Sequence, residues 1–301
     1  MSNNRLPSDG GYEERALNST RRKRFDRRDC LKFAGAAVVA GFGATSTASA
    51  ASYETITVPS NDQEIVRVED GETLENKIYD VTANDASLRM VATGSDWTVR
   101  NIGVRGQNRD DDDFPYTIAA GVDEGSIGII ENVYLGDGAA PEKGSIAIKV
   151  TLPHAGTLTI RNCYIEDWPA NGIYGAAPGR DPPDKQGGNG AVQIEQCYAR
   201  NNNLSNYRIS DNSYVRDSVV HVDEDVGYGY ENPEKVNARG IWVKEGGDCE
   251  ISNCDVLLEH PDASYCIVEY DEEEEGTARV SDVSCLPAMA RRASSDPTAV
   301  I

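Results

Sequence analysis

Apolar and polar positions recur along the chain in one short pattern centred on an Asn, Asp or Gln. An aliphatic residue stands two positions before the centre and another usually stands three positions after it, as in the stretch from Ile160 to Ile165. The centres are Asn101, Asn132, Asn162, Gln196, Asp217, Asn253 and Asp282, which are 31, 30, 34, 21, 36 and 29 residues apart. A period of roughly 20–50 residues predicts stacked units, none of which buries its apolar face alone.

Short alternating segments around each centre predict strands, and no helical period persists over a long window. Each repeat contains two strands that flank the polar centre and one isolated strand, such as 145–150, 172–175, 207–210 and 240–244. The polar centre is predicted to form a sharp bend, because Asn and Asp tolerate left-handed backbone geometry. The segment 71–80 fits either a strand that turns or a short capping helix at the end of the stack.

This arrangement resembles the right-handed parallel β-helix of the pectate-lyase-like superfamily, in which a ladder of Asn residues occupies one bend of each coil. Three stretches, 95–106, 171–179 and 196–209, are also similar to exported haloarchaeal β-helix proteins. The resemblance covers roughly residues 60–285. It implies an all-β fold, a single-stranded right-handed parallel β-helix (a solenoid) of about eight to ten coils. It implies no particular activity, because many reactions use this scaffold.

Acidic residues dominate the composition. The chain has 29 Lys and Arg against 50 Asp and Glu, a net charge of −21. The first fifty residues hold nine basic and five acidic residues, so the remainder carries a net charge of −25. Such a surface repels nucleic acid and anionic membranes. We interpret the acid-rich, Lys-poor composition as halophilic adaptation, which makes acidic runs weak evidence for a site.

The N-terminal segment predicts export. Arg27-Arg28, within the run from Asp26 to Lys32, resembles a twin-arginine (Tat) signal peptide, and a weakly apolar run follows from Phe33 to Ala44. Ala48-Ser49-Ala50 fits a cleavage site, and the apolar run is too short for a comfortable membrane span. We therefore expect a signal peptide and disordered N-terminus over 1–50, a β-helix domain over 51–290 and a disordered tail over 291–301. The expected partners include the twin-arginine translocation machinery, with no membrane partner for the mature, secreted protein.

Six cysteines remain in the expected mature chain: Cys163, Cys197, Cys249, Cys254, Cys266 and Cys285. Cys163, Cys197 and Cys254 each follow a polar centre by one residue, so a stacked fold would align them in a column. They are interpreted either as buried thiols that fill the core or as disulfides formed outside the cell. Cys285 could stack on Cys254 if a one-residue bulge shifts the last repeat.

The candidate site lies on the outward face of the isolated strand. Alternation predicts one outward column of Ala147, Tyr174, Arg208, Trp242 and Ile267, and a second of Lys149, Ala176, Ser210, Lys244 and Glu269. Insertions over 105–115, 175–190 and 221–237 abut this strand and are expected to form the walls of a groove. Alternatively, the aromatic residues simply stack on a parallel sheet, as such residues do in general.

Aromatic rings that pack on sugars, together with cations that pair with uronate or sulfate groups, suit an acidic polysaccharide. The expected substrate-binding residues are Tyr174, Trp242, Lys149, Arg180 and Arg239. A polysaccharide lyase removes the proton α to a uronate carboxyl and stabilises the resulting charge, so Arg208 and Lys244 are the candidate catalytic residues. The alternative is a non-catalytic glycan-binding or cell-surface structural protein.

A family lyase also implies Ca²⁺, for which 110–113 and 223–225 offer carboxylates, although both runs fit a solvated acidic surface. The three histidines, His154, His221 and His260, are expected to be surface loop residues rather than a metal site.

Overall fold

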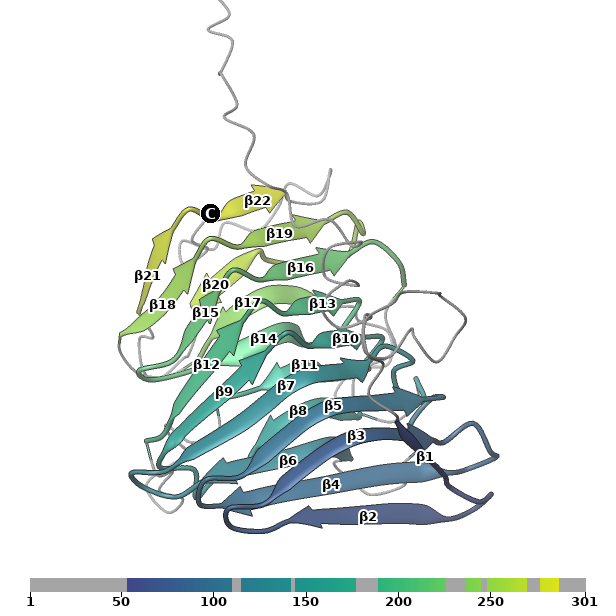
Figure 1. The fold of residues 1–301 in the computed structure, drawn as a ribbon. Helices are drawn as coiled ribbons and strands as arrows, with labels where there is room; N and C mark the ends of the chain where they lie inside the picture. The colour runs from purple at the N-terminus through teal and green to yellow at the C-terminus, as the bar shows by residue number, and fades with distance from the viewer. Residues whose placement is uncertain are drawn as a thin grey trace, which may run out of the picture.

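The computed structural model describes residues 53–109, 115–141, 144–176, 189–225, 237–244, 248–269 and 277–286. These residues form strands that stack from β2 at one end to β22 at the other (Figure 1). The strands belong to two sheets, and the strands paired within each sheet of the described residues run parallel. Within the described ranges no residue is helical, so the fold is all-β. Of the two alternatives for 71–80, the structure has the strand, over Thr73–Asp80, and not the capping helix.

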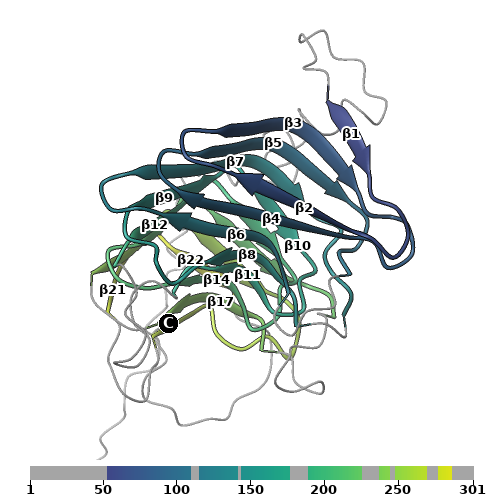
Figure 2. The same ribbon diagram turned by 90° about the horizontal axis from the view of Figure 1, so that it is seen from below.

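Sheet B contains eight strands. In spatial order they are β2 (Gln63–Val68), β4 (Ser87–Gly94), β6 (Tyr116–Val122), β8 (Ile146–Val150), β11 (Asn171–Tyr174), β14 (Ser205–Ile209), β17 (Arg239–Val243) and β20 (Ile267–Glu269). Each of these is the isolated strand of one repeat. The view along the stack shows them on one side of the molecule (Figure 2).

Sheet A contains 14 strands and divides into two arms. It begins with β1 (Glu54–Thr57), β3 (Thr73–Asp80), β5 (Thr98–Arg105) and β7 (Ile127–Leu135). The first arm continues with β9 (Thr157–Arg161), β12 (Ala191–Glu195), β15 (Tyr214–Arg216), β18 (Cys249–Ser252) and β21 (Ala278–Ser281). The second arm continues with β10 (Tyr164–Glu166), β13 (Tyr198–Arg200), β16 (Val219–Val222), β19 (Asp255–Leu258) and β22 (Ser284–Leu286).

The arms separate at the polar centres. Residues of β7 before Asn132 pair with β9, and residues after it pair with β10. All seven predicted centres, and Asn76 in addition, have a backbone φ between 51° and 56°. The predicted left-handed bend is therefore confirmed at every centre, and the segment 71–80 contains an eighth copy. Side-chain amides link neighbouring bends: Asn101 Nδ2 donates to Asn76 Oδ1 at 2.9 Å, and Asn132 Nδ2 donates to Asn101 Oδ1 at 3.1 Å.

One turn of the chain thus comprises a strand in sheet B, a strand in the first arm, a bend and a strand in the second arm. The aliphatic residues that flank the bend, such as Ile160 and Ile165, are fully buried between the sheets. The two ends of the stack differ, because each lacks a described neighbour on one side: Leu74 in the first turn is partly buried, and Val280 in the last is 41% exposed. Burial of these aliphatic columns is the main force that holds the turns together.

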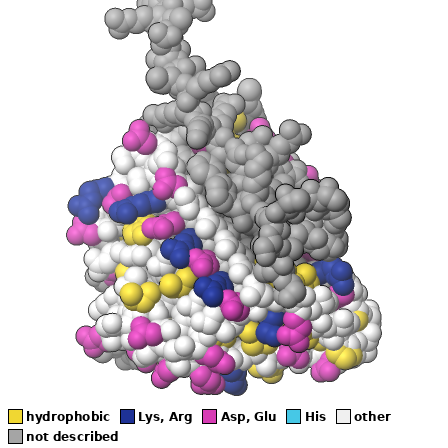
Figure 3. Space-filling view, in the orientation of Figure 1, with side chains coloured by type: hydrophobic (Ala, Val, Ile, Leu, Met, Phe, Trp, Pro, Cys, Tyr) yellow, Lys and Arg dark blue, Asp and Glu magenta, His cyan; other side chains and the backbone are white. Residues whose placement is uncertain are grey.

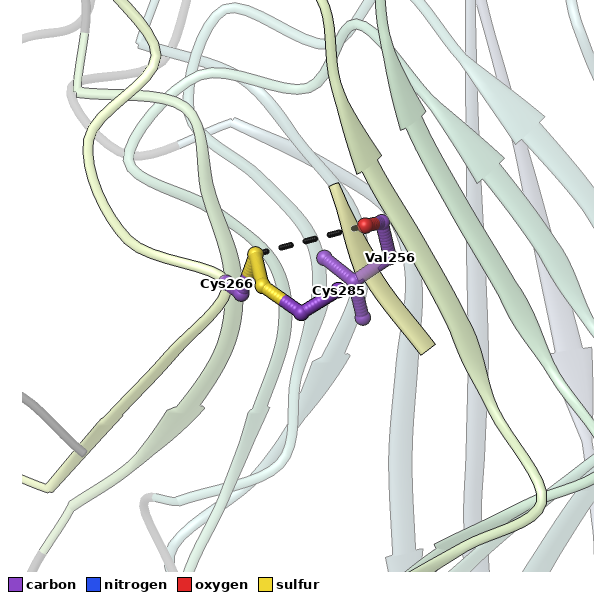
Figure 4. The surroundings of a disulfide bond; sticks show 3 residues. All are labelled: Val256, Cys266 and Cys285. Carbon is purple, nitrogen blue, oxygen red and sulfur yellow. Dashed lines mark hydrogen bonds between the residues drawn. A yellow bond between two sulfur atoms is a disulfide. The ribbon is translucent and has the colours of Figure 1, made fainter. Parts of the chain in front are cut away.

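The cysteines follow both of the expected patterns. Cys163, Cys197 and Cys254 are buried free thiols, as is Cys249. Burial raises the pKa of Cys249 and of Cys254 to about 12, which keeps both thiols protonated and unreactive. Cys266, which directly precedes β20 of sheet B, forms a disulfide with Cys285 in β22 of sheet A (Figure 4). Cys285 pairs in register with Val256, so the expected stacking on Cys254 is wrong.

Candidate functional site

Sheet B carries the predicted column of Tyr174, Arg208 and Trp242. Tyr174 is the register partner of Arg208, and Arg208 is the register partner of Trp242, on the adjacent strands β11, β14 and β17. The residues on either side of them, including Ile173 and Ile241, are buried in the core. The three side chains therefore share the outward face, as alternation predicts.

Several members of the predicted columns are in other positions, including Glu269, which pairs with the core residue Val243 instead of standing beside Lys244. Lys149 pairs with Tyr174, so it belongs to the first column rather than the second. The shift is two residues, which leaves Lys149 on the outward face. Ile267 pairs with the core residue Ile241 and is 1% exposed, so its predicted outward position is wrong. The outward residue beside Trp242 is Val268.

Cations and aromatic rings alternate across this face. We call this set the cation–ring row; its members are Arg89, Tyr116, Lys149, Tyr174, Arg208, Trp242 and Arg239. The Arg208 guanidinium carbon lies 4.3 Å from the centroid of the Tyr174 ring and 4.2 Å from that of Trp242. Arg239 lies 4.4 Å from the Trp242 ring, and Lys149 Nζ lies 5.6 Å from the Tyr116 ring. Arg89 completes the row at 5.0 Å from Tyr116.

Arg208 is held inside this row. Its strand lies between those of Tyr174 and Trp242, and the side chain of Arg208 is 8% exposed with a ring on each side. A guanidinium is permanently protonated and has no acceptor, so it cannot remove a proton from a substrate. Burial also keeps it from direct contact with a polymer on the surface. Arg208 therefore lies between the two rings, and its expected catalytic role, as a stabiliser of charge, stays a prediction.

The other cations of the face are more accessible. Lys149, Arg239 and Lys244 are half-buried, as are Tyr174 and Trp242. Burial lowers the pKa of Lys149, so a larger fraction of its amine is unprotonated at a given pH than in an exposed lysine. Lys244 follows β17 two positions after Trp242, on the same face, and its amide donates to the Ile209 carbonyl at 2.9 Å. Arg239 donates to the Leu204 carbonyl at 3.1 Å.

Several expected features lie outside the described residues. They are Arg180, the acidic run 110–113 and most of the three insertions that were expected to wall a groove. The candidate site is thus defined here by its floor, the outward face of sheet B.

The second arm of sheet A carries a second group of polar side chains. It begins with a column of stacked rings, in which the centroids of Tyr134 and Tyr164 are 5.3 Å apart and those of Tyr164 and Tyr198 are 5.2 Å apart. Two positions further along the strands, Glu166 pairs in register with Arg200 and Arg200 with His221.

Arg200 is the centre of this second group. Its side chain is 8% exposed and forms salt bridges with Glu166, with Asp223 at 2.7 Å and with Glu224 at 2.5 Å. Burial alone would lower the pKa of Arg200, but hydrogen bonds and charge from these carboxylates raise it. Burial raises the pKa of Asp223, but the hydrogen bonds from Arg200 and the charges of His221 and Arg200 together outweigh that effect and leave the pKa below its usual value. The arrangement fixes the Asp223 carboxylate in one orientation.

His221 lies beside this carboxylate and belongs to a strand, β16. Its Nε2 is 2.8 Å from Glu259 Oε2 and 3.7 Å from Asp223 Oδ2, while its Nδ1 is 3.2 Å from the Tyr198 hydroxyl. The three side chains are 21%, 25% and 53% exposed for His221, Asp223 and Glu259.

The expectation that all three histidines are surface loop residues is wrong for His154 and His221. His154 is fully buried. Its Nδ1 accepts a hydrogen bond from the Val122 amide at 3.1 Å. Burial lowers the pKa of His154. His260 does lie in a turn, where Nε2 contacts Asp225 at 3.0 Å.

The sequence contains a signal for the second group, namely the number of residues that separates each side chain from the polar centre of its repeat. Asp223 is six residues after the centre Asp217, and Glu259 is six residues after the centre Asn253. Residues at the same distance from the bend stack on one another in neighbouring turns. The sequence therefore predicts that these two carboxylates lie side by side. His221 is four residues after Asp217, which sets it on the same face as Asp223.

Along the described part of the chain, no helix is long and apolar enough to cross a membrane. Comparisons with protein-family models, with curated proteins and with solved structures find no match to this chain.

Proposed function

We propose that this chain is an exported protein that binds an acidic polysaccharide along the outward face of sheet B. The cation–ring row carries the proposal. In a chain with a net charge of −21, four basic side chains gather over one sheet, and three aromatic rings hold them there. Carboxylates or sulfates of a linear polymer are the anions that such a row suits.

We also propose that the two sheets are faces of one right-handed parallel β-helix of the pectate-lyase-like superfamily. Strands of sheet B alternate along the chain with strands of sheet A, and each pairs with its equivalent in the next turn. Parallel crossovers of this kind are right-handed in nearly all proteins. Eight strands in sheet B correspond to eight coils.

In this proposal the cations of the row have two tasks. Lys149, Arg239 and Lys244 contact the polymer, while Arg208 positions the rings of Tyr174 and Trp242. Lys149 on β8 and Arg239 on β17 are three strands apart, so the basic groups that contact the polymer are separated by about 14 Å along the stack. A polymer that runs across the strands would therefore meet a charged group repeatedly, and several moderate contacts would add up to useful affinity.

A lyase is the second candidate, and one observation favours it. The lowered pKa of Lys149 gives an amine that can accept a proton at a pH closer to neutral than an ordinary lysine can. In that case Lys149 would be the base, Lys244 a stabiliser of the developing charge, and Ca²⁺ a partner of the substrate carboxylates.

One experiment tests both candidates. The full chain is mixed with a panel of uronate-containing and sulfated polysaccharides in high salt with Ca²⁺, and both binding and the ultraviolet absorbance of unsaturated products are followed. We expect binding to an acidic polymer that weakens about tenfold in Lys149→Gln and in Lys244→Gln, because a hydrogen bond to a charged group is worth about 1.5 kcal/mol. Ultraviolet-absorbing product that disappears in Lys149→Gln would establish the lyase.

The matched control is Lys77→Gln, which makes the same charge change on β3 of sheet A, where Lys77 pairs with Glu54 at 2.5 Å. Equal weakening in Lys77→Gln, or no binding to any acidic polymer, would contradict the proposal. The thermal unfolding midpoint of each variant, measured in the same buffer, separates lost binding from lost structure.

A further inference from the structure

The side chains of His221, Asp223 and Glu259 converge on one point of the second arm of sheet A. They come from two adjacent turns: His221 belongs to β16, Asp223 directly follows β16, and Glu259 directly follows β19. The residues that alternate with them, Val220, Val222 and Leu258, are buried in the core, so all three polar side chains share the outward face.

Their separations suit coordination of one small cation. One nitrogen and two oxygens, one from each side chain, lie within 4.8 Å of one another. Ligands at about 2.0–2.2 Å from a tetrahedral ion are about 3.4 Å apart. The separation of His221 Nε2 from Asp223 Oδ2, 3.7 Å, is close to that spacing. One nitrogen and two carboxylates form a donor set that first-row divalent transition metals accept and that leaves positions for water.

Neighbouring side chains hold two of these ligands in place. The Tyr198 hydroxyl contacts Nδ1 of His221, which leaves Nε2 directed at the carboxylates. Arg200 bonds both oxygens of Asp223, at 2.7 Å through Nε and at 3.0 Å through Nη2. Contacts of this kind from outside the ligand set orient ligands in natural metal sites.

The surrounding charge favours a cation. The group itself contains two carboxylates, Asp223 and Glu259, and two more, Glu166 and Glu224, lie beside it. The described contacts place one basic side chain, Arg200, among these four.

We propose that His221, Asp223 and Glu259 bind a divalent transition metal ion, represented by Zn²⁺, on the second arm of sheet A. The site is separate from the cation–ring row of sheet B and does not depend on the proposed glycan binding. By joining two adjacent turns, a bound ion would hold the end of the second arm together.

The test is calorimetric titration of the full chain with Zn²⁺, after treatment with a chelator and in molar KCl with excess Mg²⁺ to occupy scattered carboxylates. We expect the binding of one Zn²⁺ ion per chain to require His221, Asp223 and Glu259. Its affinity should fall at least tenfold in His221→Ala and in Glu259→Gln, and less in Tyr198→Phe. Bound Zn²⁺ should also raise the thermal unfolding midpoint of the parent chain and not that of His221→Ala.

His260→Gln is the matched control, since His260 also contacts a carboxylate, Asp225, but stands outside the three-ligand group. Its Zn²⁺ affinity should equal that of the parent chain. Glu259 is exposed enough that Glu259→Gln should fold even if His221→Ala does not. Unchanged Zn²⁺ binding in Glu259→Gln, equal loss in His260→Gln, or tighter binding of Ca²⁺ than of Zn²⁺ would overturn the proposal.

Discussion

At the scale of single residues, the left-handed bend is the feature on which each turn depends. Asn132 combines two contributions: a backbone φ of 53°, and a side-chain amide that donates to Asn101 of the preceding turn. Asn is among the few residues that adopt this conformation at low cost, and Gly adopts it freely. Gln196, with a φ of 52°, is the least suited residue in the series.

Substitutions at Asn132 should therefore reverse the usual order of alanine and glycine. Asn132→Gly loses the side-chain hydrogen bond and should lower the free energy of unfolding by about 1 kcal/mol. Asn132→Ala loses the same bond and also forces a side chain into the left-handed region, which adds about 1–2 kcal/mol. Denaturant unfolding measures both values, and a more stable Asn132→Ala variant would contradict this account.

The bends could be predicted from the sequence because the backbone preference of Asn and Asp is local. Asn76 was not recognised as a centre, although Leu74 precedes it and Tyr79 follows it at the expected spacing. An aromatic residue in the place of an aliphatic one concealed that copy. Pairwise contacts such as that of His221 with Glu259 required the offsets from two successive bends to be compared, which the local pattern does not supply.

At the scale of strands, the register of neighbouring turns arranges charges as well as apolar groups. The position before the bend carries Glu75, Arg100, Glu131, Arg161, Glu195 and Arg216 in successive turns, and each is the register partner of the next. Two contacts within this column are short, Arg100 to Glu75 at 2.6 Å and Arg161 to Glu131 at 2.7 Å. Figure 3 shows basic and acidic side chains beside one another on this side of the molecule.

Register is also where prediction from the sequence fails. Alternation has a period of two, so a shift of two residues, as at Lys149, leaves every side chain on its expected face. The pattern therefore predicts the face of Lys149 but not its neighbour. Near Ile267 several apolar residues are consecutive, from Cys266 to Val268, so alternation does not determine which of them points inward.

The disulfide between Cys266 and Cys285 should stabilise the last turn locally. It links residues 19 positions apart, and closing a loop of this size is worth about 3 kcal/mol in the unfolded chain. In Cys285→Ser the amides of β21 and β22 should exchange with solvent faster, whereas those of β9 and β10 should not change, because neighbouring turns carry the contacts. Hydrogen exchange measured by mass spectrometry tests this.

Ser284→Ala is the matched control for that measurement, since it changes the adjacent exposed position of β22 and keeps the disulfide. Faster exchange throughout both sheets in Cys285→Ser would show that the bond supports the whole stack instead of its end.

At the scale of the whole molecule, the excess of acidic residues opposes the packing of the turns. A net charge of −21 repels itself at low ionic strength, and salt screens this repulsion over a distance of about 10 Å at 0.1 M. The ion pairs in the column before the bend reduce the repulsion between neighbouring turns locally, but they leave the net charge unchanged.

The thermal unfolding midpoint should therefore rise as KCl is increased from low concentration to molar concentration. Each kcal/mol of repulsion removed should add about 2–4 °C. NaCl at equal ionic strength should give the same rise, because screening depends on ionic strength rather than on the cation. A midpoint that falls with salt would show that the ion pairs contribute more than the net charge costs.

The shared conformation of the bends has a consequence for how such a chain can change through descent. The spacing between successive centres varies from 21 residues, between Gln196 and Asp217, to 36 residues, between Asp217 and Asn253, yet φ at these three bends stays between 51° and 52°. Differences in length are thus absorbed between bends, and the contacts of a turn are with its two neighbours. A gene segment that encodes one turn can be duplicated or lost while the remaining turns keep their contacts, so the turn is a unit of inheritance as well as of structure.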